Sequence, residues 1–259
     1  MGGFNLVGFC EATPGTGTNL VNVGLLEQHY MVSNNVDLQI TKEAPYVLGV
    51  FGVGVSTLGD VILRQPKMID YKFKKTSLVA DVAPLCSFTD YMGRALPLRI
   101  DKLNALVVNA TDEACLIGVF LGSGKITRAM QDQVNPTHVI QGQGDTTITT
   151  LTWSHCPITW DTLDAGTYEI VGMRATVFGG ADMALMRLVI PGSQNWRPGV
   201  IAGQAQADHE EAQSLERLPF DQWPLMGIKF DEKHLPNVEC LGIGASTDQN
   251  VELQLQKIA

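Results

Sequence analysis

The run Asp208-His209-Glu210-Glu211 is the richest group of potential metal ligands in the sequence. Carboxylate oxygens and imidazole nitrogens are common ligands of zinc and other divalent cations. Consecutive residues of a helix or strand point in different directions, however, so these four side chains cannot converge on one ion without an irregular loop. No pair among the five histidines has the close spacing of a zinc site. We therefore expect a solvated helical face here, and neither a metal nor another cofactor.

The run Ser154-His155-Cys156 places two potential nucleophiles beside a histidine. A histidine activates a hydroxyl or a thiol only when the two side chains are within hydrogen-bonding distance. Neighbouring residues of a strand point to opposite faces, so His155 does not activate Cys156 within this run. The sequence also has no Gly-x-Ser-x-Gly motif. It therefore predicts no nucleophilic catalysis, and we expect a protein that is not an enzyme.

The run Gly122-Ser123-Gly124-Lys125 resembles part of a phosphate-binding loop. That loop needs a glycine where Val119 stands and a serine or threonine after the lysine, where Ile126 stands. The pattern instead predicts a turn that leads into a short helix over 127–134, which ends before Pro136.

The composition is typical of a folded protein and argues against several functional classes. Of 259 residues, 45% are hydrophobic and 17% are charged, which favours a folded body over a disordered chain. The net charge of −9 and the scattered basic residues argue against a surface for nucleic-acid phosphates. The five cysteines lie far apart, which predicts free thiols, buried where they fall in apolar strands such as those of Cys115 and Cys240. We expect no signal peptide, and no transmembrane segment because no apolar run approaches about 20 residues.

Two pairs of apolar runs dominate the strand pattern. The run 166–178 alternates between two unlike faces, whereas 183–190 is apolar nearly throughout, as expected of a strand buried on both faces. Gly179-Gly180 between them supplies the positive φ angles of a tight turn and predicts the central hairpin of a β-sandwich. The runs 96–110 and 114–121 repeat this pattern and predict a second hairpin.

The spacing of the strand candidates predicts an all-β chain with few short helices. A break near residues 136–145 divides the candidates into two consecutive sandwiches, over 36–140 and 141–259. Residues 1–35 are rich in Gly, Thr and Asn and predict an N-terminal arm with little regular structure. The arm's apolar residues could dock on a neighbouring subunit, so we take them as candidate assembly residues: Leu20, Val21, Val23, Leu25 and Leu26.

The corner Trp196-Arg197-Pro198-Gly199 is the second candidate for a subunit contact. Pro198 restricts both its own φ and the conformation of Arg197, and Gly199 allows close approach of the backbone. Trp and Arg are frequent anchors of protein interfaces. Trp196 and Arg197 therefore either contact another subunit or stabilise the sandwich that carries them.

The C-terminal half resembles jelly-roll major capsid proteins of uncultured small viruses and phages, including the compact double jelly-roll type. The resemblance rests on Gly-Thr-Tyr-Glu-Ile-Val-Gly at 166–172, the apolar strand that follows, Trp-Arg-Pro-Gly at 196–199, Trp-Pro-Leu-Met-Gly-Ile-Lys-Phe at 223–230, and Val-Glu-Leu-Gln-Leu at 251–255. It implies two jelly-roll-like sandwiches in a structural protein that assembles with itself, through trimers or pentamers, into a virion shell. It also implies a location in the virion after assembly in the host cytoplasm, other virion proteins as possible partners, and no sequence-specific nucleic-acid binding.

Two other functional classes fit the same sequence. One is a β-sandwich module that binds a glycan or a cell surface. The other is an oligomeric enzyme whose site is shared between subunits.

Overall fold

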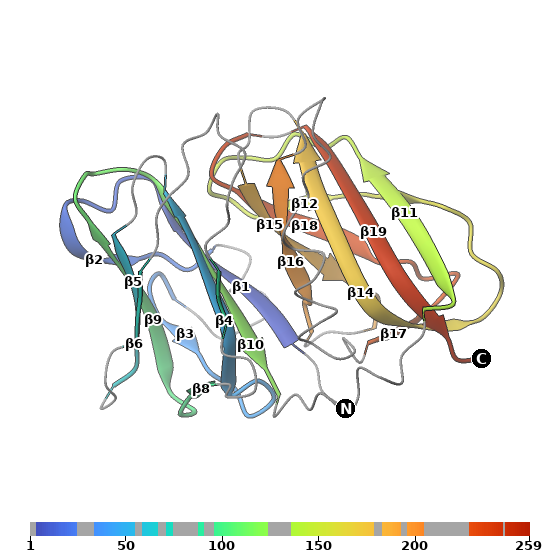
Figure 1. The fold of residues 1–259 in the computed structure, drawn as a ribbon, viewed down its shortest axis with the longest axis horizontal. Coiled ribbons are helices and arrows are strands. Elements are labelled where there is room, and N and C mark those ends of the chain that lie inside the picture. Colours follow the sequence, from blue (N-terminus) through green and yellow to red (C-terminus); the bar gives the residue numbers. More distant parts are fainter. Residues whose placement is uncertain are drawn as a thin grey trace.

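Runs rich in β-branched and apolar residues, separated by Gly- and Pro-containing turns, form strands throughout the protein. A computed structural model describes residues 4–24, 34–54, 59–66, 71–74, 88–90, 96–123, 136–178, 183–192, 196–204, 228–245 and 247–259. Within these ranges the chain forms nineteen β-strands and no helix (Figure 1). The predicted all-β class is confirmed, and the predicted helix over 127–134 lies outside the described residues.

The first half of the chain forms two antiparallel sheets, which we call sheets I and II. Sheet I has the spatial order β2 (Gly17–Val21), β9 (Lys102–Asn109), β5 (Asp60–Arg64) and β6 (Tyr71–Lys74), with β3 (Leu38–Gln39) also paired to β9. Sheet II has the order β1 (Phe4–Glu11), β10 (Cys115–Gly122), β4 (Tyr46–Gly54) and β7 (Phe88–Asp90), with β8 (Leu96–Pro97) also paired to β4.

The second half of the chain forms two further layers, sheets III and IV. Sheet III has the order β12 (Ser154–Cys156), β18 (Asn237–Gly242), β15 (Met183–Val189) and β16 (Gly199–Gln204). Sheet IV has the order β11 (His138–Gly144), β19 (Asp248–Lys257), β14 (Thr167–Phe178) and β17 (Lys229–Asp231), with β13 (Thr159–Trp160) also paired to β11. A short parallel contact between β14 and β16 links the two layers at one corner.

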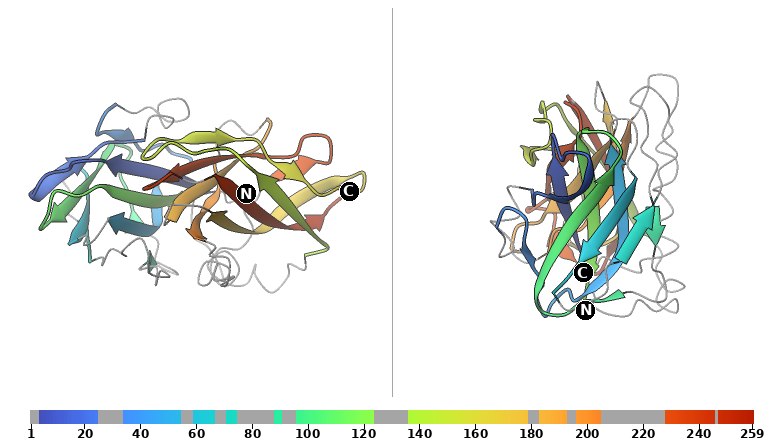
Figure 2. Two further views of the ribbon diagram at one scale, coloured as in Figure 1. Left: turned by 90° about the horizontal axis from the view of Figure 1, so that it is seen from above. Right: turned by 90° about the vertical axis from the view of Figure 1, so that its left-hand side faces the viewer.

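Both halves have the same strand order. When the small strands β3, β8 and β13 are set aside, each half has eight main strands in the spatial orders 1-8-3-6 and 2-7-4-5. This order is that of a jelly roll, in which two Greek keys form two facing sheets. The chain therefore consists of two jelly-roll sandwiches in tandem, which lie side by side along the long axis of the molecule (Figure 2).

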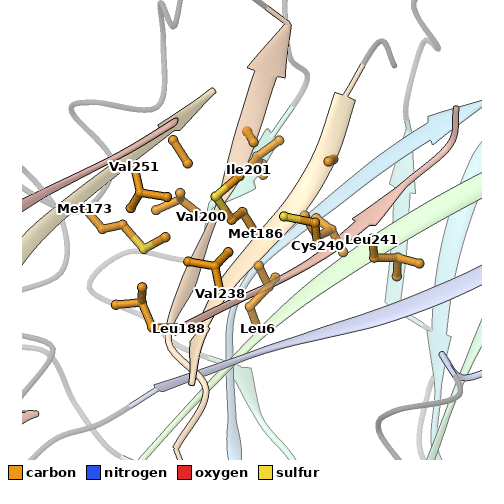
Figure 3. Close-up of a cluster of buried hydrophobic side chains, with 14 of the residues drawn as sticks. Leu6, Met173, Met186, Leu188, Val200, Ile201, Val238, Cys240, Leu241 and Val251 are labelled. Carbon is orange, nitrogen blue, oxygen red and sulfur yellow. The ribbon is translucent and has the colours of Figure 1, made fainter. Parts of the chain in front are cut away.

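The four sheets stack in the order I, II, III, IV. Val7, Phe9 and Val107 belong to the core between sheets I and II. A second buried cluster joins sheets II, III and IV, and Figure 3 shows Leu6 of β1 in the same cluster as Met173 of β14 and Val238 of β18. Sheets II and III are thus covered on both faces. This explains why all eight residues of β10 are buried, as is most of β15.

Both predicted hairpins are wrong, although their strands exist. β14 and β15 do not pair with each other, because β14 lies in sheet IV and β15 in sheet III. In the same way β9 lies in sheet I and β10 in sheet II. A chain that crosses from one layer to the next places its two strands on opposite sides of a core, so the fully apolar strand of each pair becomes part of an inner sheet.

The predicted boundaries also need correction. Residues 4–11 and 17–21 of the predicted arm form β1 and β2 of the first sandwich, where Leu6, Val7 and Phe9 are fully buried. The predicted division between residues 140 and 141 falls inside β11, which begins at His138. Residues 145–153, between β11 and β12, form a loop with one bridging residue, Thr150.

Candidate functional site

A buried ion pair lies where the two sandwiches meet. Nε of Arg187, on β15, donates a hydrogen bond to Glu239 of the neighbouring strand β18 at 2.7 Å, and the two residues are 1% and 2% exposed. Nη1 of Arg187 also donates to the Leu6 carbonyl oxygen of β1 at 3.3 Å. One guanidinium therefore connects sheet III of the second sandwich with sheet II of the first.

Trp153 completes the surroundings of this guanidinium. The Cζ atom of Arg187 lies 3.8 Å from the centroid of a Trp153 ring, a distance at which the aromatic face attracts a cation. The indole in turn lies against β1 and the segment after β2, where a Cβ atom on Gly8 or Gly24 would come within 3.2 and 2.7 Å of it. Glycine at these positions therefore lets the indole approach the backbone of the first sandwich.

The corner Trp196-Arg197 lies beside this ion pair and joins the same two sandwiches. The backbone amide of Arg197 donates to the side-chain oxygen of Asn5, and the Leu6 amide donates to the Arg197 carbonyl oxygen at 2.9 Å. The Leu188 amide donates to the Pro198 carbonyl oxygen at 2.7 Å. The corner thus connects β1 with β15 inside one chain.

Of the two roles considered for Arg197, burial of its side chain within the chain favours stabilisation of the sandwich. Its relative exposure is 7%, and its Nη1 donates to the Trp196 carbonyl oxygen. Trp196 is half-buried and packs against both hydrophobic clusters. Gly199 does allow close approach, since a Cβ atom there would collide with the Met186 carbonyl oxygen.

The candidate assembly residues divide into three groups. Val21 and Val23 are 0% and 3% exposed and belong to the core of the first sandwich, so they are not free to dock on a neighbour. Leu20 is 46% exposed on the outer face of sheet I. Leu25 and Leu26 lie outside the described residues. Gly- and Thr-rich sequence predicted an arm, whereas pairing of β1 with β10 and of β2 with β9 makes residues 4–21 part of the sandwich.

The four cysteines of the described ranges are buried, and the side chains of Cys156 and Cys240 are hydrogen-bonded to each other. Cys10, Cys115, Cys156 and Cys240 lie in the interior, which confirms the predicted burial of Cys115 and Cys240. Burial raises the pKa of the Cys115 thiol to about 12. His155 is exposed whereas Cys156 is buried, as the alternation of a strand requires. The described ranges contain no group of three metal-binding side chains, and 208–211 lies outside them.

A polar groove of about 1030 Å³ lies over the outer face of sheet IV. Gln141, Glu252 and Arg174 face one another across β11, β19 and β14, and Gln143, Asn250 and Thr176 form the next row. Residues that alternate with them along the strands, such as Ile140 and Leu253, point into the core. Asp145 and Asp248 lie at one end of the groove.

Sequence reasoning missed both the ion pair and the groove. Arg187 interrupts the apolar run 183–190, and Glu239 stands beside the apolar residues 240 and 241. A charged residue in the centre of such a run indicates a buried partner. Glu252, Gln254 and Gln256 alternate with apolar residues and indicate a solvated face, but the polar residues of β11 and β14 lie beside them only because these strands pair with β19.

No protein family model matches the sequence, and a search of curated proteins finds no similar sequence. Within the described ranges, no helix has the length and apolar character needed to cross a bilayer.

Proposed function

We propose that the protein is the major capsid subunit of a small virus or phage, and that it assembles with itself into a virion shell. Trimers or pentamers are the building blocks in this proposal, with other virion proteins as possible partners. In this proposal the subunit performs no catalysis and needs no cofactor. It is located in the virion, which assembles in the host cytoplasm. The resemblance described above and the tandem jelly-roll order both favour this function.

The stacking of the sheets is the observation that carries the proposal. Sheet II of the first sandwich packs on sheet III of the second, so the stack runs I-II-III-IV and its two ends are unlike. Two unlike ends allow head-to-tail association, and such heterologous contacts close into rings when the rotation permits. Stable contacts of this kind bury about 2,000 Å² or more. Leu20, exposed on the outer face of sheet I, supplies apolar surface for such a contact.

The experiment is to measure the mass and shape of the purified protein at micromolar concentration in several salt concentrations. Light scattering after size-exclusion chromatography gives the mass, and negative-stain electron microscopy gives the shape. We expect closed rings or shells. A strictly monomeric 28.1 kDa species under all conditions would contradict the proposal.

Two variants locate the contact. Leu20→Lys places a charge on the outer face of sheet I and is expected to prevent assembly while the melting temperature stays unchanged. Ile100→Lys is the matched control, because Ile100 is 57% exposed in the loop between β8 and β9, outside the sheets. Equal loss of assembly in both variants would show that charge alone, and not the face of sheet I, is responsible.

A further inference from the structure

We propose that the polar groove on sheet IV binds a neutral glycan. The site belongs to sheet IV and the segments beside it. Its floor is the outer face of β11, β19 and β14, and its volume of about 1030 Å³ is at the upper end of the range of small-ligand pockets. A short oligosaccharide is the size of ligand that fits it.

The corresponding face of the first sandwich is apolar and packs against the second sandwich. β1, β10 and β4 have the same places in the first jelly roll as β11, β19 and β14 in the second. Their outward residues include Leu6, Leu116 and Phe120, which pack against the second sandwich. At the equivalent face, sheet IV carries Gln, Asn, Glu, Arg and Thr. Of these two equivalent sheets, sheet II is therefore apolar on the face that contacts the second sandwich, and sheet IV is polar on the face that forms the groove.

The side chains of the groove match hydroxyl groups. Gln141, Gln143 and Asn250 each carry an amide that both donates and accepts hydrogen bonds, as a sugar hydroxyl does. In the described part of the chain, no side-chain hydrogen bond engages these three amides. Thr159 and Thr176 add hydroxyl groups to the same lining. A ligand rich in hydroxyls can thus bond to several side chains at once.

The charges of the groove select against anionic ligands. Its described lining residues include the carboxylates of Asp145, Asp248 and Glu252 but one guanidinium, that of Arg174. This excess of negative charge repels phosphates, sulfated sugars and sialic acids. It also distinguishes the groove from the centre of a protein interface, where charged residues are depleted. A neutral glycan therefore fits better than a nucleic acid or a second copy of the chain.

The test measures binding of four neutral probes to the full chain: cellohexaose, maltohexaose, mannohexaose and chitohexaose. Titration calorimetry and ligand-observed NMR report the affinity. Gln143→Ala and Asn250→Ala each remove one amide and are expected to weaken binding about fivefold, the effect of losing about 1 kcal/mol of hydrogen bonding. Gln256→Ala is the matched control, since Gln256 lies on the same face of β19 but outside the groove.

A heparin hexasaccharide and hexalysine complete the set of probes. Binding of at least one neutral probe that weakens in both groove variants, and not in the control, supports the proposal. Failure of all four neutral probes, or binding that the groove variants leave unchanged, overturns it. So does binding of heparin or hexalysine in their place. Loss of assembly in the groove variants without glycan binding would assign the face to a subunit contact, which leaves the shell proposal intact.

Discussion

Replacing Glu239 with methionine is expected to destabilise the protein by about 3–5 kcal/mol, because it leaves the charge of Arg187 buried without its carboxylate. Arg187 is 1% exposed, so its guanidinium cannot turn to water. The Trp153 ring, 3.8 Å from Cζ, offsets part of this loss and places the value near the lower end of the range. Arg187→Met leaves Glu239 buried instead and is expected to cost a similar amount.

The double variant Arg187→Met, Glu239→Met is expected to be only about 1–2 kcal/mol less stable than the natural protein. It buries no charge and loses mainly the hydrogen bond to the Leu6 carbonyl oxygen. Unfolding by guanidinium chloride, followed by tryptophan fluorescence, gives the free energies of unfolding, and Trp153 lies beside the substituted site. The four proteins form a double-mutant cycle, from which the coupling energy of the pair is obtained.

The exposed ion pair between Lys102 and Asp37, 2.8 Å long, is the control. Lys102→Met is expected to leave the free energy of unfolding nearly unchanged, because water solvates both charges. Two results would refute the reasoning. One is a loss of less than about 1 kcal/mol of unfolding free energy in each single variant at 187 and 239, and the other is a loss in the double variant that equals the sum of the two.

Three further predictions concern the first sandwich. The hydrogen bonds from Lys102 and Asn104 lower the pKa of Asp37 to about 2, below its value in the unfolded chain. The stabilisation of the fold by this carboxylate is therefore present above about pH 4 and is lost as the pH falls towards 2. Asp37→Asn should cost about 1 kcal/mol of unfolding free energy at pH 7 and almost none at pH 2. Deleting residues 1–24 removes β1 and β2, and circular dichroism should show an unfolded or aggregated first sandwich; a truncated chain with unchanged melting would contradict the place of these strands in the core. Gly118→Val inserts a side chain at a position where even a Cβ atom would lie 2.8 Å from Leu185, and thermal unfolding should show a loss of about 1–3 kcal/mol in the free energy of unfolding. An unchanged melting temperature would mean that sheets II and III are not in close contact there.

The sequence by itself determined the strands whose environment follows from periodicity. Val251, Leu253 and Leu255 alternate with polar residues, a pattern typical of a strand with one buried and one solvated face, and β19 has this form. The continuous apolar runs of β10 and β15 correctly indicated burial on both faces. Hydrophobic alternation has the period of the strand itself, so these features depend on local sequence.

Strand pairing was decided by the tertiary structure. Two glycines between two strand sequences are compatible with a hairpin and with a crossing from one sheet to the next. The sequences on either side of the glycines have the same hydrophobic pattern in both cases. β14 and β15 lie in different sheets because β14 pairs along its length with β19, whereas β15 pairs with β18 and with β16. The N-terminal segment shows the same effect, since β1 lies in the region predicted to be an arm and forms a strand by pairing with β10.

The contacts between the sandwiches also depend on the complete fold. Arg187 meets the carbonyl oxygen of Leu6 across 181 positions of sequence, and Glu239 across 52. A lone charge in an apolar run shows that a partner is needed, because an isolated buried charge is too costly. Which residue provides that partner follows from the order in which the sheets stack, and that order is a property of the whole chain.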